Sequence, residues 1–154
     1  MKAIHFLTAI IIFFSISVNA QECKDFEKMQ KKIETEKVGY LTKELDLSVE
    51  EAQKFWPVYN EAQTKRDKLY IEKRKLMKQI HKNIDSMSDD EIKSSLDRVL
   101  AIDVELSQLK LNYHKKYEKI LNPRKTAKLY QAEREFRKTL LRDIRKAHHG
   151  KMRP

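Results

Sequence analysis

The chain has 154 residues, with 33 lysines and arginines against 23 aspartates and glutamates, which gives a formal net charge of +10 at neutral pH. It contains no HExxH, no CxxC, no glycine-rich phosphate loop and no nucleophile elbow. We therefore expect no enzymatic activity and no obligatory cofactor. The single cysteine, Cys23, cannot form an intramolecular disulfide, and it either links two chains or is a thiol without a structural role.

Residues 1–20 have the composition of an export signal. Lys2 precedes an apolar stretch over residues 4–18, and Val18-Asn19-Ala20 suits cleavage by a signal peptidase. The apolar stretch is short for a membrane-spanning helix, which needs about 20 residues, although an uncleaved anchor is the alternative. We predict a signal peptide at 1–20 and a single exported helical domain at 21–154.

The mature chain keeps nearly all of the positive charge, because Lys2 is the only charged residue lost with the signal and +9 remains. An exported protein meets little nucleic acid, so we expect none as a partner. The acidic partners outside the cytoplasm are anionic lipid or lipopolysaccharide surfaces and acidic protein segments. The alternative is that the lysines only solvate exposed helix faces.

After residue 20 the apolar residues recur at steps of three and four, so we predict an all-α fold of four helices. The first helix covers about 24–45. The second begins at Ser48, where Glu51 three residues later completes a capping box. Pro57 removes a backbone hydrogen bond, and we expect a kink near 53–57.

The third helix begins at Ser88, with Glu91 in the capping-box position, and the fourth begins with the cap Asn122 followed by Pro123. We expect the fourth helix to stop at Gly150. The second and third helices would each have about 32–36 residues, or roughly 50 Å at 1.5 Å per residue. Their apolar stripes are narrow, which favours an elongated, curved antiparallel layer that pairs with a second copy as a homodimer.

Two stretches that begin helices are similar to one another and lie 74 positions apart: Leu47-Ser48-Val49-Glu50-Glu51-Ala52-Gln53 and Leu121-Asn122-Pro123-Arg124-Lys125. The pattern resembles the LTxxQ motif, which occurs twice in the Spy/CpxP family of periplasmic helical proteins. Ser48 replaces the threonine of the first copy and its glutamine is displaced to Gln53, while the second copy has Asn122 and Lys125. The segment Phe55-Trp56-Pro57-Val58-Tyr59-Asn60-Glu61 looks like the Bacteroidetes branch of that family, described as sensors of ECF-type sigma factors.

The resemblance implies a periplasmic location, an elongated, curved helical dimer and a role in the envelope stress response. Members of the family include an ATP-independent chaperone, an inhibitor of a sensor kinase, and metal-responsive sensors that relay to an anti-sigma factor. We therefore expect non-covalent binding of unfolded or misfolded envelope proteins, or of a membrane-bound sensor or anti-sigma factor. The alternatives are a metal-responsive sensor that relays to an anti-sigma/ECF sigma system and a passive helical protein associated with a membrane surface.

Aromatic residues alternate with lysines and arginines along the predicted helices, and such a mixed face can bind unfolded chains without sequence preference. We expect Phe55, Trp56 and Phe136 to lie in the core or at the dimer interface, and Tyr70 and Tyr130 to be partly exposed. The candidate binding residues are Tyr59, Tyr70, Tyr113, Tyr117, Tyr130, Arg137, Arg142 and Arg145.

A metal site is a further hypothesis. Met77 and His81 are four residues apart and share a helix face, and His148 and His149 adjoin one another near the C-terminus. Thioether and imidazole ligands together suit zinc, copper or nickel. The alternative is that Met77 belongs to the apolar stripe and that the two histidines are exposed tail residues.

Residues 134–154 carry eight basic residues against Glu135 and Asp143, a net +6. Leu140, Leu141 and Ile144 give this segment an apolar side. It either docks on an anionic membrane surface or an acidic partner, or is a solvated helix end favoured by the helix dipole.

Overall fold

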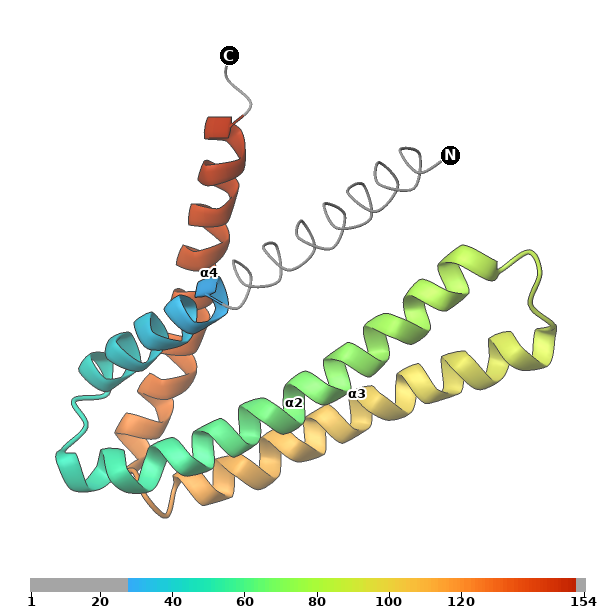
Figure 1. Ribbon diagram of the computed structural model, residues 1–154. Coiled ribbons are helices and arrows are strands. Elements are labelled where there is room, and N and C mark those ends of the chain that lie inside the picture. The colour runs from blue at the N-terminus through green and yellow to red at the C-terminus, as the bar shows by residue number, and fades with distance from the viewer. Residues whose placement is uncertain (1–27, 152–154) are drawn as a thin grey trace, which may run out of the picture. The chain divides into compact units, whose positions relative to one another are not determined.

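The computed structural model describes residues 28–151, with side chains up to Lys146. A first helix covers residues 28–44 and is followed by three helices labelled in Figure 1: α2 (Val49–Asn83), α3 (Asp89–Tyr117) and α4 (Pro123–Lys151). Within this range the predicted all-α class and the four helices are confirmed. The predicted signal peptide and Cys23 lie outside the described residues.

The chain divides into two compact units, which are described separately. One unit, residues 44–131, contains α2, α3 and the first turns of α4. The other contains the described residues up to Lys43 and the part of α4 from Ala132 onwards.

Both predicted capping boxes are confirmed. The Ser48 hydroxyl accepts from the Glu51 N–H at 3.1 Å, and the Ser48 N–H donates to Glu51 Oε2 at 2.9 Å. At the start of α3, the Ser88 N–H donates to Glu91 Oε2 at 2.8 Å and the Ser88 hydroxyl accepts from the Glu91 N–H. Each box satisfies backbone N–H groups that the first turn of a helix leaves without intrahelical partners.

The fourth helix begins as predicted, but it ends later. Asn122 Oδ1 accepts from the Lys125 N–H at 2.9 Å, and Pro123 is the first helical residue. The predicted stop at Gly150 is wrong, because α4 continues to Lys151. Glycine commonly ends a helix by taking up the left-handed conformation, whereas the backbone at Gly150 stays helical.

The two long helices have 35 residues (α2) and 29 residues (α3), so α3 is shorter than expected. It ends at Tyr117 because residues 118–120 form a turn. Pro57 lies inside α2, where it has no N–H to donate to the preceding turn. The helix continues through it, and the ribbon bends over the first turns (Figure 1).

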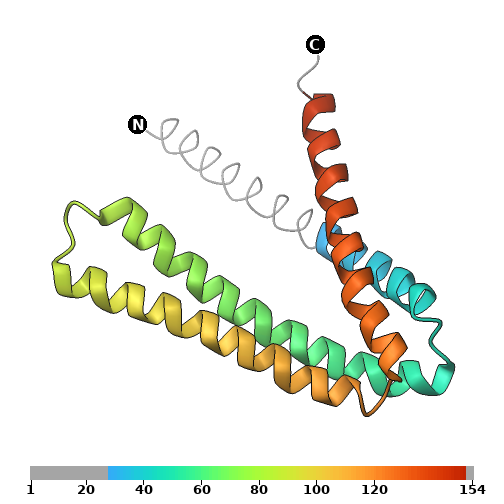
Figure 2. The ribbon, with the colours of Figure 1, turned by 180° about the vertical axis from the view of Figure 1, so that it is seen from behind.

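α2 and α3 lie side by side as an antiparallel hairpin (Figures 1 and 2). Their shared core is richest in aromatic rings near the start of α2, where the ring centroids of Phe55 and Tyr117 are 5.6 Å apart. Ion pairs also link the two helices, with Lys73 at 2.5 Å from Asp103 and Arg98 at 2.7 Å from Glu72. The residues buried along the two helices are Phe55, Tyr59, Ala62, Ile80, Val99, Ile102, Tyr113 and Tyr117.

The second unit pairs the helix over residues 28–44 with the later part of α4. The rings of Tyr40 and Phe136 lie 5.6 Å apart, and Leu41 and Ala132 are buried. None of the helices in the described part of the chain combines the length and apolar character needed to cross a membrane.

The two similar sequence stretches meet in the unit that contains the hairpin. Lys125 Nζ donates to the Asp46 carbonyl at 2.5 Å and to Glu51 Oε2 at 2.6 Å. Asp46 has a backbone φ of 47° in the turn before α2, and the Lys125 contact satisfies its carbonyl. The hydrogen bond from Lys125, followed by that from the Ser48 N–H, lowers the pKa of Glu51.

Candidate binding site

An exposed row of apolar residues runs along one side of α3. Leu96, Leu100, Val104 and Leu111 follow one another at steps of four, four and seven, which places them on the same side of a helix. Between 43% and 70% of each residue is exposed. We call these four residues the α3 row. A different set of α3 residues packs against α2, so the row is left facing solvent.

Two residues of α2 extend this apolar surface. Tyr70 and Met77 are seven residues apart, and both are nearly half exposed. They flank Lys73, whose ion pair reaches Asp103, and Asp103 is three residues from Leu100 in the α3 row. Tyr70, Met77 and the α3 row are therefore exposed on the same side of the hairpin. We call this surface the binding face.

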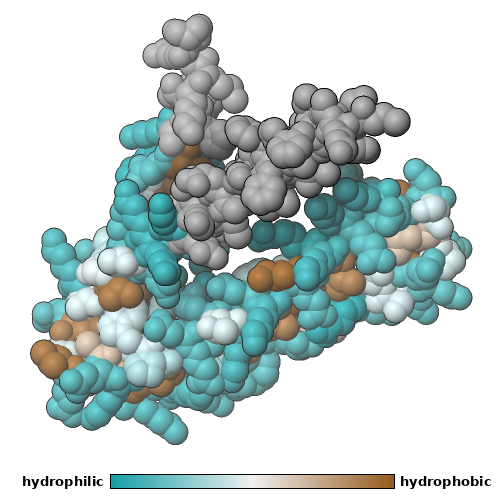
Figure 3. Space-filling model, in the orientation of Figure 1, coloured by the Kyte–Doolittle hydropathy of each residue, from teal (hydrophilic) through white to brown (hydrophobic). Residues whose placement is uncertain are grey.

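The face of the protein seen in Figure 3 is mainly hydrophilic among the described residues. Figure 3 shows hydrophobic residues along the hairpin as separate patches among charged and polar ones. Isolated exposed apolar residues are common on soluble proteins, but the α3 row has four of them on one side of one helix, which makes it a candidate contact surface.

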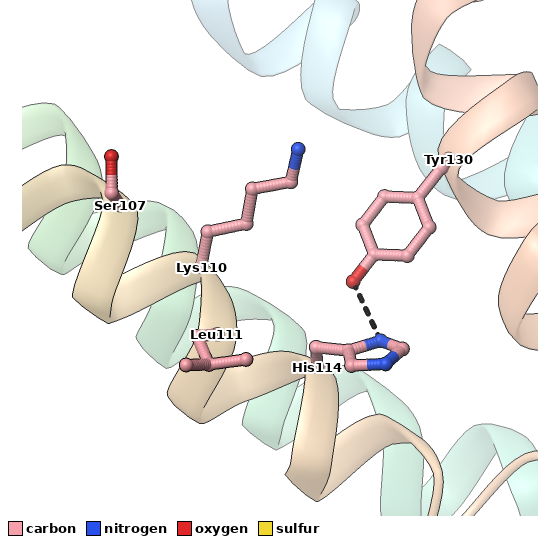
Figure 4. Close-up of a pocket in the computed structure, with 5 residues that line it drawn as sticks. All are labelled: Ser107, Lys110, Leu111, His114 and Tyr130. Atoms are coloured by element: carbon pink, nitrogen blue, oxygen red, sulfur yellow. Dashed lines mark hydrogen bonds between the residues drawn. The ribbon is translucent and has the colours of Figure 1, made fainter.

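A pocket of about 320 Å³ lies at one end of the α3 row. It is lined by Ser107, Lys110, Leu111 and His114 of α3 and by Tyr130 of α4 (Figure 4). Leu111 belongs both to the row and to the pocket, so the apolar row leads directly into a hollow with polar groups.

A chain of polar contacts fixes one wall of this pocket. The Tyr130 hydroxyl lies 3.0 Å from His114 Nδ1 (Figure 4), and His114 Nε2 lies 3.3 Å from Glu118 Oε1. The contact between the Tyr130 hydroxyl and His114 Nδ1 is a hydrogen bond whose donor depends on the imidazole tautomer, and this bond orients the Tyr130 ring.

The charged group of the pocket is Lys110. Its ammonium nitrogen lies 5.4 Å from the centroid of the Tyr130 ring, and no carboxylate among residues 28–146 pairs with it. Lys65 differs, because it binds Glu61 at 2.7 Å, and this bond is the largest cause of the lowering of the Glu61 pKa to about 2. Lys110 is therefore a cation whose charge is not already neutralised by a described partner.

The structure places the five candidate tyrosines in two groups. Tyr70 is exposed and Tyr130 is half-buried, as predicted. Tyr59, Tyr113 and Tyr117 are buried in the hairpin, so their position does not support the binding role given to them. The reason is that α2 and α3 turn these rings toward each other, where they also contact Phe55 and one another.

The residues expected in the core differ in their burial. Phe55 is completely buried, whereas Trp56 and Phe136 are half-buried. The candidate arginines Arg137, Arg142 and Arg145 are exposed on the later part of α4, in the unit that does not contain the binding face.

The candidate metal ligands are only partly described. Met77 and His81 are exposed near the end of α2, and the side chains of His148 and His149 lie outside the described residues. Within the described part of the chain, no three histidine, cysteine, aspartate or glutamate side chains gather as a metal site would require. The metal site stays a prediction, and calorimetric titration with zinc, copper and nickel tests it.

The sequence-based candidates did not include the main parts of the binding face. Leu100, Val104 and Leu111 repeat Leu96 at helical spacing, so a second apolar row on α3 could have been found beside the buried one. Lys110 and His114 carry no comparable signal, because their importance depends on Tyr130 of another helix.

No protein-family model matches the chain, and neither a curated protein nor a solved structure matches it. The relation to the Spy/CpxP family therefore rests on the sequence pattern and stays a prediction.

Proposed function

We propose that this protein is a periplasmic, Spy/CpxP-like envelope-stress protein that binds unfolded or misfolded proteins non-covalently through the binding face. The observation that carries the proposal is the α3 row: four large apolar side chains on one side of a helix, each 43% to 70% exposed. Unfolded chains expose apolar side chains along their length, so they can cover a surface of this kind and remove it from water.

The surface suits weak and reversible binding. Covering the exposed part of one half-exposed leucine contributes about 1 kcal/mol, so the face offers several kcal/mol before the losses of motional freedom are subtracted. The surrounding lysines attract acidic segments and raise the rate of encounter. Binding of this kind needs no ATP, because release follows when the client folds and buries its own apolar residues.

The proposal covers a signalling partner as well as a client. A membrane-bound sensor or anti-sigma factor that presents an apolar, acidic segment would bind the same face. Homodimerisation is also part of the proposal, and a second copy is a competing occupant of the face. Sedimentation velocity of the mature chain with and without an unfolded client separates a dimer from a client complex.

The decisive test compares two variants that remove exposed apolar residues. In the face variant, Leu100 and Val104 are replaced by glutamine (L100Q/V104Q). The control is Ile71→Gln. Ile71 directly follows Tyr70, so its side chain points about 100° around α2 from that of Tyr70, and it does not belong to the binding face. Both Ile71 and the two α3 residues are more than half exposed, so folding should be little affected.

The readout is the aggregation of reduced, unfolded α-lactalbumin without ATP, at equimolar ratio. The wild-type chain and I71Q should suppress aggregation, and L100Q/V104Q should lose most of this protection while keeping its helical circular dichroism. Equal protection by all three proteins, or none by the wild type, would contradict the proposal.

A further inference from the structure

We propose that the pocket at the end of the α3 row binds a carboxylate, so that the preferred partner segments carry an acidic residue next to apolar ones. This inference rests on the proposed function and names the chemistry of the partner. The pocket residues are the five drawn in Figure 4.

The charge of the pocket is positive. Its five lining residues include the ammonium of Lys110, and none of the five is acidic. The nearby Glu118 is engaged with Nε2 of His114, the ring nitrogen that does not face Tyr130. An ammonium group has three donors and no acceptor, so the group that it binds best is an anion with acceptor oxygens.

The walls of the pocket explain why the anion should belong to an apolar segment. Figure 4 shows Lys110 extended from α3 beside the Tyr130 ring, with Leu111 completing the apolar lining. The Ser107 hydroxyl donates to the Asp103 carbonyl at 2.9 Å, which leaves Lys110 as the main donor. A volume of about 320 Å³ holds a carboxylate together with a few carbon atoms or one aromatic ring.

The α3 row and the pocket are continuous, so a segment bound along the row reaches the pocket at one end. Because Leu111 is shared, a segment whose apolar side chains lie on the α3 row has a neighbouring side chain at Lys110. An acidic residue there gains an ion pair, and an uncharged one does not. The binding face would therefore favour segments that mix apolar and acidic residues over purely apolar segments.

The test uses two acetylated and amidated peptides of one apolar sequence that differ only in a central glutamate or glutamine. Their dissociation constants are measured by fluorescence anisotropy for the wild-type chain, Lys110→Gln and Lys115→Gln. Lys115 is an exposed lysine of α3 outside the pocket and serves as the matched control. We expect the wild type and K115Q to bind the glutamate peptide about two- to fivefold more tightly than the glutamine peptide.

In K110Q the preference should disappear, while the affinity for the glutamine peptide stays unchanged. Equal affinities for both peptides in the wild type, or a preference that persists in K110Q, would overturn the carboxylate site and leave the apolar binding face intact. If neither peptide binds, the proposed function fails. In that case a small carboxylate probe tests the pocket separately from the binding of peptides.

That probe is 3-phenylpropionate, with uncharged 3-phenylpropanamide as its control. The acid should shift the NMR signals of the Leu111 methyl groups and the Tyr130 ring in the wild type, and these shifts should be lost in K110Q. The amide should shift them far less. No shift with millimolar acid, or equal shifts with acid and amide, overturns the site.

Discussion

The carboxylate of Glu51 and the ammonium of Lys125 lie 2.6 Å apart, although the two residues are 74 positions apart in the sequence. They occupy the same position in the two similar stretches, four residues after Leu47 and Leu121. Glu51 completes the capping box of its own helix, whereas Lys125 cannot and reaches across to Glu51 and the Asp46 carbonyl. The two similar stretches are therefore linked through the position at which they differ, Glu51 in the first and Lys125 in the second.

The Glu51–Lys125 pair should stabilise the fold measurably. Both side chains are more than three-quarters buried, with 24% and 20% exposed, so the pair is less screened than a surface ion pair. In a double-mutant cycle with Glu51→Gln and Lys125→Met, urea unfolding should give a coupling free energy of about 1 kcal/mol. Purely additive effects would show that the pair contributes nothing.

The same pair predicts a pH dependence of stability. The pKa of Glu51 is lowered in the folded chain, while an unfolded glutamate titrates near about 4.3. The stabilisation is therefore complete above that unfolded value and is lost as the pH falls through the lower folded value. The difference in unfolding free energy between wild type and E51Q should be constant from about pH 7 to 5 and shrink in acid; a difference that grows in acid would contradict this.

Asp46 should tolerate substitution selectively. Its φ of 47° lies in the left-handed region, which costs a β-branched residue about 1–2 kcal/mol and costs asparagine or glycine little. Asp46→Val should lower the free energy of unfolding by about that amount, and Asp46→Asn should be near neutral. Asp85→Val, in the turn after α2, is the control, because no other described non-glycine residue has a positive φ. Equal losses at both positions would remove the conformational explanation.

Buried and exposed tyrosines should behave in opposite ways. Tyr117 is 6% exposed and contacts Phe55, so Tyr117→Ala should destabilise the chain by about 3–5 kcal/mol. Tyr70 is 48% exposed, so Tyr70→Ala should change stability by less than about 0.5 kcal/mol but weaken client binding. Thermal unfolding and the aggregation assay together distinguish the two roles. A stable Tyr117→Ala variant that no longer binds clients would place this ring on the functional surface after all.

The local features of the fold were predictable from the sequence. Ser48 with Glu51, Ser88 with Glu91, and Asn122 before Pro123 act through hydrogen bonds within three residues, so their spacing alone carries the information. Helical spacing of apolar residues likewise predicted the four helices. The continuation of α4 through Gly150 was not predictable, because glycine can take up both helical and left-handed backbone conformations.

The contacts between helices were less predictable. α3 has two apolar rows at helical spacing, and periodicity does not say which of them packs against α2. Val99 and Ile102 turned out to be buried, while Leu100 and Val104 are exposed. The pocket likewise depends on Tyr130 of α4 lying against His114 of α3, which no local pattern specifies.

Photo-crosslinking from the binding face tests the central proposal most directly. The photoreactive residue p-benzoylphenylalanine is placed at position 100 in the α3 row or at position 71 on α2, and each protein is irradiated with unfolded α-lactalbumin. We predict a crosslinked client from position 100 and little or none from position 71. Crosslinks of equal yield from both positions, or crosslinks from position 100 only to a second copy of the chain, would contradict client binding by the α3 row.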